Sequence, residues 1–176
     1  MNNIGLTGSF AIGGLVLLTL IYIFFKFTLR QQTVALGDIT QQSLTNVGRI
    51  VEYDFDKIGY RVSGGQKITS IDTFSISFLS DLDNDGTTDS VSYYRTIDSS
   101  GTHLYRRTSQ GQNSTWFVNI SELFIQGFDS ASAATYTPAN IRSILIRFVL
   151  DNNALSSDTT QNIGAYWQKR FFPKNL

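Results

Sequence analysis

An uncharged, apolar run near the beginning of the sequence limits what the chain can become more than any other feature. The first 25 residues contain no Asp, Glu, Lys or Arg, and residues 4–25 read IGLTGSFAIGGLVLLTLIYIFF. As a helix rising about 1.5 Å per residue, this run exceeds the roughly 30 Å of a bilayer's hydrocarbon core. Lys26 and Arg30 follow it, and such side chains extend toward lipid headgroups. We therefore expect a helix that crosses a membrane.

A cleaved signal peptide is the main alternative for this run. Such a peptide has a basic start, an apolar core of about 7–15 residues and a cleavage site flanked by small residues. Here the start is uncharged, the core is longer, and it leads into bulky Tyr22, Phe24, Phe25 and Phe27. We interpret the run as a retained anchor. A buried helix of a soluble protein is less consistent with its length.

The overall composition averages over two different segments, the uncharged apolar run and a mildly acidic remainder. The chain has 176 residues, with 14 basic and 14 acidic side chains and no Cys. Lys26 and Arg30 are the only charged residues before position 31. Residues 31–176 hold 12 basic and 14 acidic residues, a net charge of −2. This balance argues against a nucleic-acid binder, which carries a clustered basic excess. The absence of Cys excludes disulfide scaffolds, thiolate metal sites and Cys nucleophiles.

The helical pattern continues beyond the apolar run. Apolar residues recur mostly every three or four positions, as in an amphipathic helix, at Leu36, Ile39, Leu44, Val47, Val51, Phe55 and Ile58. Lys57 suits a last helical turn, and Gly59 suits the position after it. We predict one helix, or two nearly collinear helices, from about residue 4 to residue 58. Residues 1–30 would form its transmembrane half and residues 31–59 its amphipathic half.

Residues 60–176 have the texture of a β-rich globular domain. Runs rich in β-branched and aromatic residues, separated by Ser, Asn, Asp and Gly, occur at residues 74–78, 91–94, 104–108, 116–120, 123–128, 144–150 and 165–172. We predict an α+β fold. The C-terminal half of a long N-terminal transmembrane helix would pack on an antiparallel β-sheet, and the packed helix residues would be Val47, Val51, Phe55 and Ile58.

One motif points to specific chemistry. Residues 81–89 read DLDNDGTTD, which fits the D-x-D-x-D-G-x-x-D front of a calcium-binding loop. Ca²⁺ takes six to eight oxygen ligands, and alternate residues of a tight loop point toward one centre. The predicted metal ligands are Asp81, Asp83, Asp85, Thr87 through its carbonyl, and Asp89. Ser92 stands where an EF-hand has a bidentate Glu, so we expect a weak, non-EF-hand site for calcium.

Simpler interpretations accompany each candidate. The loop at residues 81–89 can also be interpreted as an Asp-rich hairpin turn that binds no metal and has solvated carboxylates. Asp54 and Asp56 read as helix-surface charges, His103 as a surface histidine, and Arg106 with its neighbour Arg107 as the solvated face of a strand. No P-loop, dinucleotide-binding motif or Ser nucleophile motif is present. We therefore expect no enzyme activity.

The whole layout resembles type IV pilins and type II secretion pseudopilins, which have a long hydrophobic N-terminal helix under a β-rich domain. Three short matches resemble the group of the minor pilin PilW and the pseudopilin GspJ. They are VEYDFDKIGY at residues 51–60, the Asp-rich loop leading into Val91 and Tyr93, and FPKNL at residues 172–176. The sequence departs from the family in having no Lys or Arg before residue 26 and no Glu five residues after Gly5 or Gly8.

The resemblance implies a function in assembly. The chain would be a membrane-anchored pilin-like subunit, minor or priming, of a type IV pilus or type II secretion-like filament. Its partners would be related subunits, contacted through the N-terminal helix where Gly5, Gly8, Gly13 and Gly14 permit close approach. The helix would sit in the inner membrane with the β-domain outside, although Lys26 and Arg30 alone favour the opposite orientation. The alternative is a single-pass, membrane-tethered β-domain that binds calcium, another ligand or a protein without forming filaments.

Overall fold

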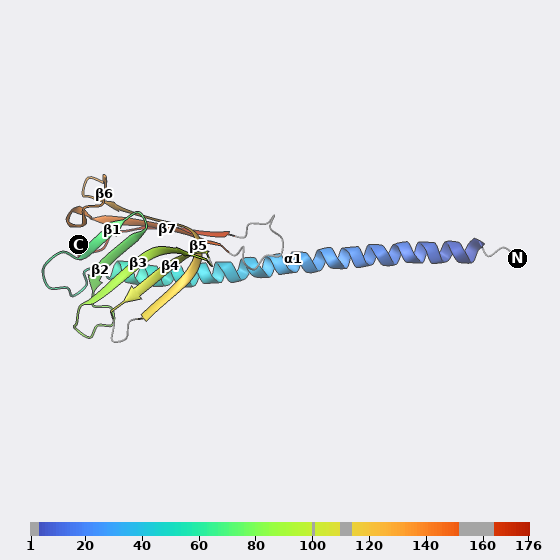
Figure 1. Cartoon of the computed structure of the whole chain (residues 1–176), viewed down its shortest axis with the longest axis horizontal. Coiled ribbons are helices and arrows are strands. Elements are labelled where there is room, and N and C mark those ends of the chain that lie inside the picture. Colours follow the sequence, from blue (N-terminus) through green and yellow to red (C-terminus); the bar gives the residue numbers. More distant parts are fainter. Residues whose placement is uncertain (1–3, 100, 110–113, 152–163) are drawn as a thin grey trace.

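The computed structural model describes residues 4–99, 101–109, 114–151 and 164–176 (Figure 1). It consists of one very long helix and a β-domain around the C-terminal end of that helix (Figure 1). Helix α1 spans Ile4–Asp56 without a break, 53 residues in all, which corresponds to a length of about 80 Å. The predicted helix is confirmed, in its single continuous form.

The end of α1 is determined by Gly59. This residue has a φ of +73°, in the left-handed region that glycine adopts without strain. Its N–H donates to the carbonyl of Leu79 at 2.8 Å. A Cβ added at Gly59 would lie 2.8 Å from the carbonyl oxygen of Asn175. The chain can therefore turn here, close against its own C-terminal segment, only with glycine.

The β-domain is one antiparallel sheet with a nearly sequential strand order. The order is β1-β2-β3-β4-β5-β7-β8, with β6 paired to β5. The strands and the one short 3₁₀ helix are β1 (Ile68–Asp72), β2 (Ser75–Ser80), β3 (Asp89–Asp98), β4 (Gly101–Thr108), β5 (Ser114–Phe128), β6 (Ala134–Thr135), η1 (Pro138–Asn140), β7 (Ser143–Asp151) and β8 (Gly164–Phe171). The predicted antiparallel sheet is confirmed.

Strand β5 joins the two halves of this sheet. Its first part pairs with β4 up to Asn119, and from Ile120 onward it pairs with β7. A register shift between Ile120 and Glu122 marks the change of partner. The sequence predicted two strands here because Ser121 and Glu122 interrupt the apolar pattern. In the structure these residues form an irregularity within one 15-residue strand. The patterns also missed β1 and the two-residue β6.

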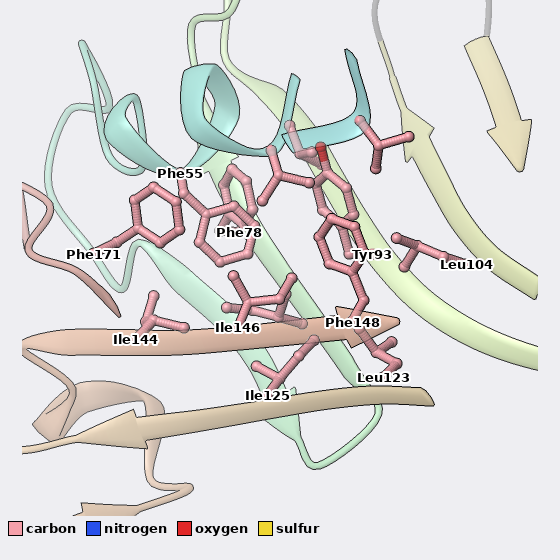
Figure 2. Close-up of a cluster of buried hydrophobic side chains, with 14 of the residues drawn as sticks. Phe55, Phe78, Tyr93, Leu104, Leu123, Ile125, Ile144, Ile146, Phe148 and Phe171 are labelled. Atoms are coloured by element: carbon pink, nitrogen blue, oxygen red, sulfur yellow. The ribbon is translucent and has the colours of Figure 1, made fainter. Parts of the chain in front are cut away.

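The hydrophobic core lies between α1 and the inner face of the bent sheet (Figure 2). Phe55 of the helix is fully buried, and its ring centroid lies 5.6 Å from those of Phe78 and Tyr93 and 5.0 Å from that of Phe171. The predicted helix contacts Val47, Val51, Phe55 and Ile58 are all buried. Strand residues complete the core in alternation, as Ile76 and Phe78 do on β2. The C-terminal part of the helix therefore packs on the sheet.

The first part of α1 projects away from the β-domain (Figure 1). From Gly8 onward its large apolar side chains that the structure describes are exposed, among them Phe10 at 75% and Phe24 at 70%. Thr40 is the first buried residue among the described side chains of the helix, and Ile39 of the predicted stripe is still 53% exposed. The side chain of Leu36, also in that stripe, lies outside the described part. Within Gly8–Asp56 the helix is long and apolar enough to span a membrane. None of its most apolar stretch is buried against the rest of the described chain.

Candidate metal centre

The Asp-rich loop connects β2 to β3 and lies against the end of α1. The carbonyl oxygen of Leu82 accepts hydrogen bonds from the Tyr53 hydroxyl at 2.9 Å and from Lys57 Nζ at 2.7 Å. The Asp81 N–H donates to the carbonyl of Tyr60 at 3.0 Å. The Ser80 hydroxyl donates to the carbonyl of Lys57 at 2.7 Å. The loop is therefore part of the junction between the helix and the sheet.

Three of the predicted ligands converge. One carboxylate oxygen from each of Asp81, Asp83 and Asp85 lies within 4.8 Å of the other two. The turn that brings them together uses two left-handed residues, Asn84 with a φ of +65° and Gly86 with a φ of +88°. Asn and Gly adopt this conformation at the least cost. Asp83 and Asp85 are exposed, whereas Asp81 is only 1% exposed, so an ion here would be open to water on one side.

Asp81 is the best evidence that the loop can hold a cation. Its Oδ2 atom accepts hydrogen bonds from Gly86 N at 3.2 Å and from Arg61 Nη1 at 3.3 Å. Its Oδ1 atom is buried and accepts no hydrogen bond from any residue that the structure describes. A buried carboxylate oxygen without a partner is costly. A hard cation shared with Asp83 and Asp85 would give the Asp81 carboxylate a charged partner, so the donor set fits an oxygen-bound divalent ion.

Thr87 and Asp89 have hydrogen-bonding roles inside the loop. Asp85 Oδ1 accepts both the N–H of Thr87 at 2.7 Å and its hydroxyl at 2.6 Å. These bonds, first that of the hydroxyl, hold the pKa of Asp85 below its ordinary value. Asp89 is 5% exposed, and its Oδ2 atom accepts the N–H of Leu82 at 3.1 Å across the base of the loop. Their roles as metal ligands stay predictions.

A second charged cluster was misread from the sequence. Asp54, expected on the helix surface, is fully buried, and Arg106, expected on a solvated strand face, binds it. Arg106 Nε lies 2.6 Å from Asp54 Oδ2, and Nη2 lies 3.0 Å from Oδ1. The hydroxyl of Tyr93 donates to Asp54 Oδ2 at 2.5 Å. The sequence spacing could have predicted the burial of Asp54. This residue lies seven positions after Val47 and therefore on the apolar face of the helix.

The environment of this cluster shifts two pKa values. Burial, supported by the negative charge of Asp54, raises the pKa of the Tyr93 hydroxyl well above its ordinary value. Burial opposes the charge of Arg106, but the hydrogen bonds and charge of Asp54 outweigh it and raise the pKa of the guanidinium. Tyr93 therefore stays neutral and Arg106 stays charged at ordinary pH. The cluster fastens helix to sheet and offers no accessible reactive group.

The prediction for His103 was also wrong. We expected it on the surface, yet it is 2% exposed. It neighbours the core residue Leu104 in the strand and therefore lies on the opposite face of β4, where its ring meets that of Tyr105 edge-on at 6.3 Å between centroids. Its Nε2 atom lies 3.1 Å from Asp98 Oδ1 across the β3–β4 hairpin. Arg107 is exposed, as predicted.

The chain was also compared with known proteins. A scan against protein-family models found no match, and searches of curated proteins and of solved structures found none either.

Proposed function

We propose that this protein is a membrane-anchored, pilin-like structural subunit of a type IV pilus or type II secretion-like filament, in a minor or priming role. Its work is assembly and not catalysis. The observation that carries the proposal is the continuity of α1. The same unbroken helix is apolar and exposed at one end and forms part of the β-domain core at the other.

The exposed part of the helix needs an apolar environment. Before assembly the membrane provides it, and in a filament the same surface would pack against helices of related subunits. A Cβ added at Gly8, Gly13 or Gly14 would meet nothing within 4 Å in this chain. These positions leave room for the backbone of a neighbouring helix, as small residues do in membrane helix pairs. Partners of the same or a related kind fit this surface best.

Rigidity favours a filament over a simple tether. A tethered binding module tolerates a flexible stalk. A filament subunit instead needs a rigid connection, because its packed helix must hold its β-domain at a fixed place on the filament. Residues 26–56 are helix throughout. The buried Asp54–Arg106 pair and the Phe55 contacts then fix the helix to the sheet. If the filament test fails, the result would favour the alternative function. In that case the chain would be a single-pass, membrane-tethered β-domain that binds calcium, another ligand or a protein.

We place the anchor in the inner membrane and the β-domain on the outer side. In that compartment Asp81, Asp83 and Asp85 would hold Ca²⁺, with the Thr87 carbonyl and Asp89 as further ligands. The open, partly exposed donor set supports an affinity in the weak range of extracellular calcium modules, with dissociation constants of about 10⁻⁴–10⁻³ M. Bound calcium would offset part of the negative charge of the loop and stiffen the junction to which Tyr53 and Lys57 bind.

Deletion and fractionation test the filament proposal in the cells that make this protein. We expect the chain in the membrane fraction and in mechanically sheared filaments, and we expect its deletion to reduce filament number or protein secretion. A lone membrane monomer, together with unchanged filaments and secretion in the deletion strain, would contradict the proposal.

Calcium binding is tested separately on the full chain in detergent micelles. Titration with CaCl₂ should release or absorb heat and raise the thermal midpoint, and Asp81→Asn should remove both effects. Thr69→Ala, at an exposed position of β1, is the control and should bind like the wild type. No heat and no thermal shift at millimolar Ca²⁺ would exclude the calcium site while leaving the filament proposal intact.

A further inference from the structure

Arg61 pairs with one carboxylate of the acidic loop, that of Asp81. Arg61 follows the end of α1 and has a φ of +55°. Its Nη1 atom lies 3.3 Å from Asp81 Oδ2 and 3.3 Å from the carbonyl oxygen of Asn84. One positive group thus bridges two oxygens of the loop, and one of them belongs to the buried carboxylate on which the metal site depends.

Arg61 is not needed to orient Asp81. Gly86 N–H donates to the same Oδ2 atom at 3.2 Å, and the Asp81 backbone is fixed by its bond to the Tyr60 carbonyl. The Arg61 side chain is 51% exposed, and its two contacts are long for charge-assisted hydrogen bonds. Its main effect on a bound cation is therefore electrostatic repulsion and not support of a ligand.

The neighbouring lysine differs from Arg61 in this respect. Lys57 Nζ donates to neutral oxygens, the Leu82 carbonyl at 2.7 Å and the Asn84 side chain at 3.4 Å. Its bonds hold the loop on the helix. The Arg61 guanidinium instead pairs with Asp81, so a divalent cation and Arg61 would share one carboxylate. Two cations on one carboxylate repel each other, and the guanidinium already neutralises part of its charge.

We propose that Arg61 is a built-in competitor of the divalent cation at Asp81, Asp83 and Asp85, and that its charge sets the affinity of this site. The inference rests on the proposed calcium function and adds its regulation. Arg61 holds the affinity low, so the site fills only where calcium is abundant. Binding of the ion in turn weakens the contact between Arg61 and Asp81.

The test is calorimetric titration of the full chain in micelles with CaCl₂ at low salt. Arg61→Gln removes the competing charge and should tighten the dissociation constant about three- to tenfold. Arg61→Lys keeps a charge and should stay closer to the wild type than Arg61→Gln. Arg49→Gln is the matched control, because it removes one positive charge from an exposed helix position, and Arg49 makes no hydrogen bond or ion pair with the described residues of the loop. It should leave the affinity within about twofold of the wild type.

The outcomes separate the inference from the function on which it rests. A tighter Arg61→Gln variant supports the competitor, as does binding by Arg61→Gln when the wild type shows none. An unchanged or weaker affinity in Arg61→Gln overturns the competitor while the calcium site stands. Absence of binding by both proteins overturns the calcium site and the inference together. Raising the NaCl concentration to 1 M should shrink the difference between wild type and Arg61→Gln, since salt screens exposed charges.

Discussion

Asp54 of helix α1 and Arg106 of strand β4 form a two-pronged ion pair, with distances of 2.6 and 3.0 Å, between residues 52 positions apart in the chain. Asp54 is fully buried, and Tyr93 of β3 donates a third hydrogen bond to it. Helix and sheet are therefore joined by a charged contact within an otherwise apolar core. This contact fixes both the rotation and the axial position of the helix against the domain.

Removing one partner of this pair should be costly. Asp54→Ala leaves Arg106 buried without its counter-charge, so we expect a loss of about 3–5 kcal/mol of unfolding free energy. Urea unfolding of the full chain in micelles, followed by tryptophan fluorescence, measures it. Asp56→Ala, at an exposed position of the same helix, should change the stability by less than about 0.5 kcal/mol. Equal effects of the two substitutions would show that the ion pair does not hold the junction.

A double variant separates the charge from the packing. Replacing both partners, as in Asp54→Leu with Arg106→Met, removes the unpaired charge and keeps much of the volume. We expect this variant to be more stable than Asp54→Ala, because well-packed apolar groups often replace buried ion pairs at little cost. A double variant less stable than Asp54→Ala would contradict this explanation.

The Tyr93 hydroxyl should make stability depend on pH in the alkaline range. Its pKa is raised in the folded state, chiefly by burial, so the folded chain keeps a proton that the unfolded chain loses near pH 10. Below pH 10 this contribution is fully present, and it declines as the pH rises further. Urea unfolding between pH 9 and pH 11 should show a fall in stability that is smaller in Tyr93→Phe. Identical pH profiles would mean that Tyr93 titrates normally.

The core of this fold was visible in the sequence because its patterns are local. The apolar spacing at Val47, Val51 and Phe55 predicts both the helix and its buried face, and alternation predicts most strands. The charged contacts were missed for a physical reason. Asp54 and Arg106 look solvated in isolation, and only the fold brings one to the other. The Asp-rich loop could be predicted from the spacing of its Asp residues. The contact of Arg61 with Asp81 could not, because the two residues lie 20 positions apart in the sequence.

Gly48 should be intolerant of a side chain although it lies inside a helix. A Cβ there would lie 2.8 Å from Trp167 Nε1, and that indole ring is held by stacking on Phe148 at 4.9 Å. Gly48→Ala gains about 1 kcal/mol of helix propensity but causes overpacking that costs about 1–3 kcal/mol. We expect a net loss of stability in urea unfolding.

Gly37 is the matched control for Gly48. A Cβ at Gly37 would meet nothing within 4 Å, so Gly37→Ala should be neutral or stabilising by up to about 1 kcal/mol. If both alanine variants are stabilised alike, the close approach of α1 and β8 does not constrain the helix.

We expect the exposed part of α1 to pack against helices of neighbouring subunits. A photoreactive phenylalanine derivative in place of Val34 or Ile39, both exposed, would capture whatever lies beside the helix in intact cells. A third site at Ile97, exposed on β3, reports on the β-domain. Mass spectrometry should identify adducts of positions 34 and 39 with other chains that carry a similar apolar N-terminal helix. Uncrosslinked monomer and lipid adducts alone at both helix positions would contradict it.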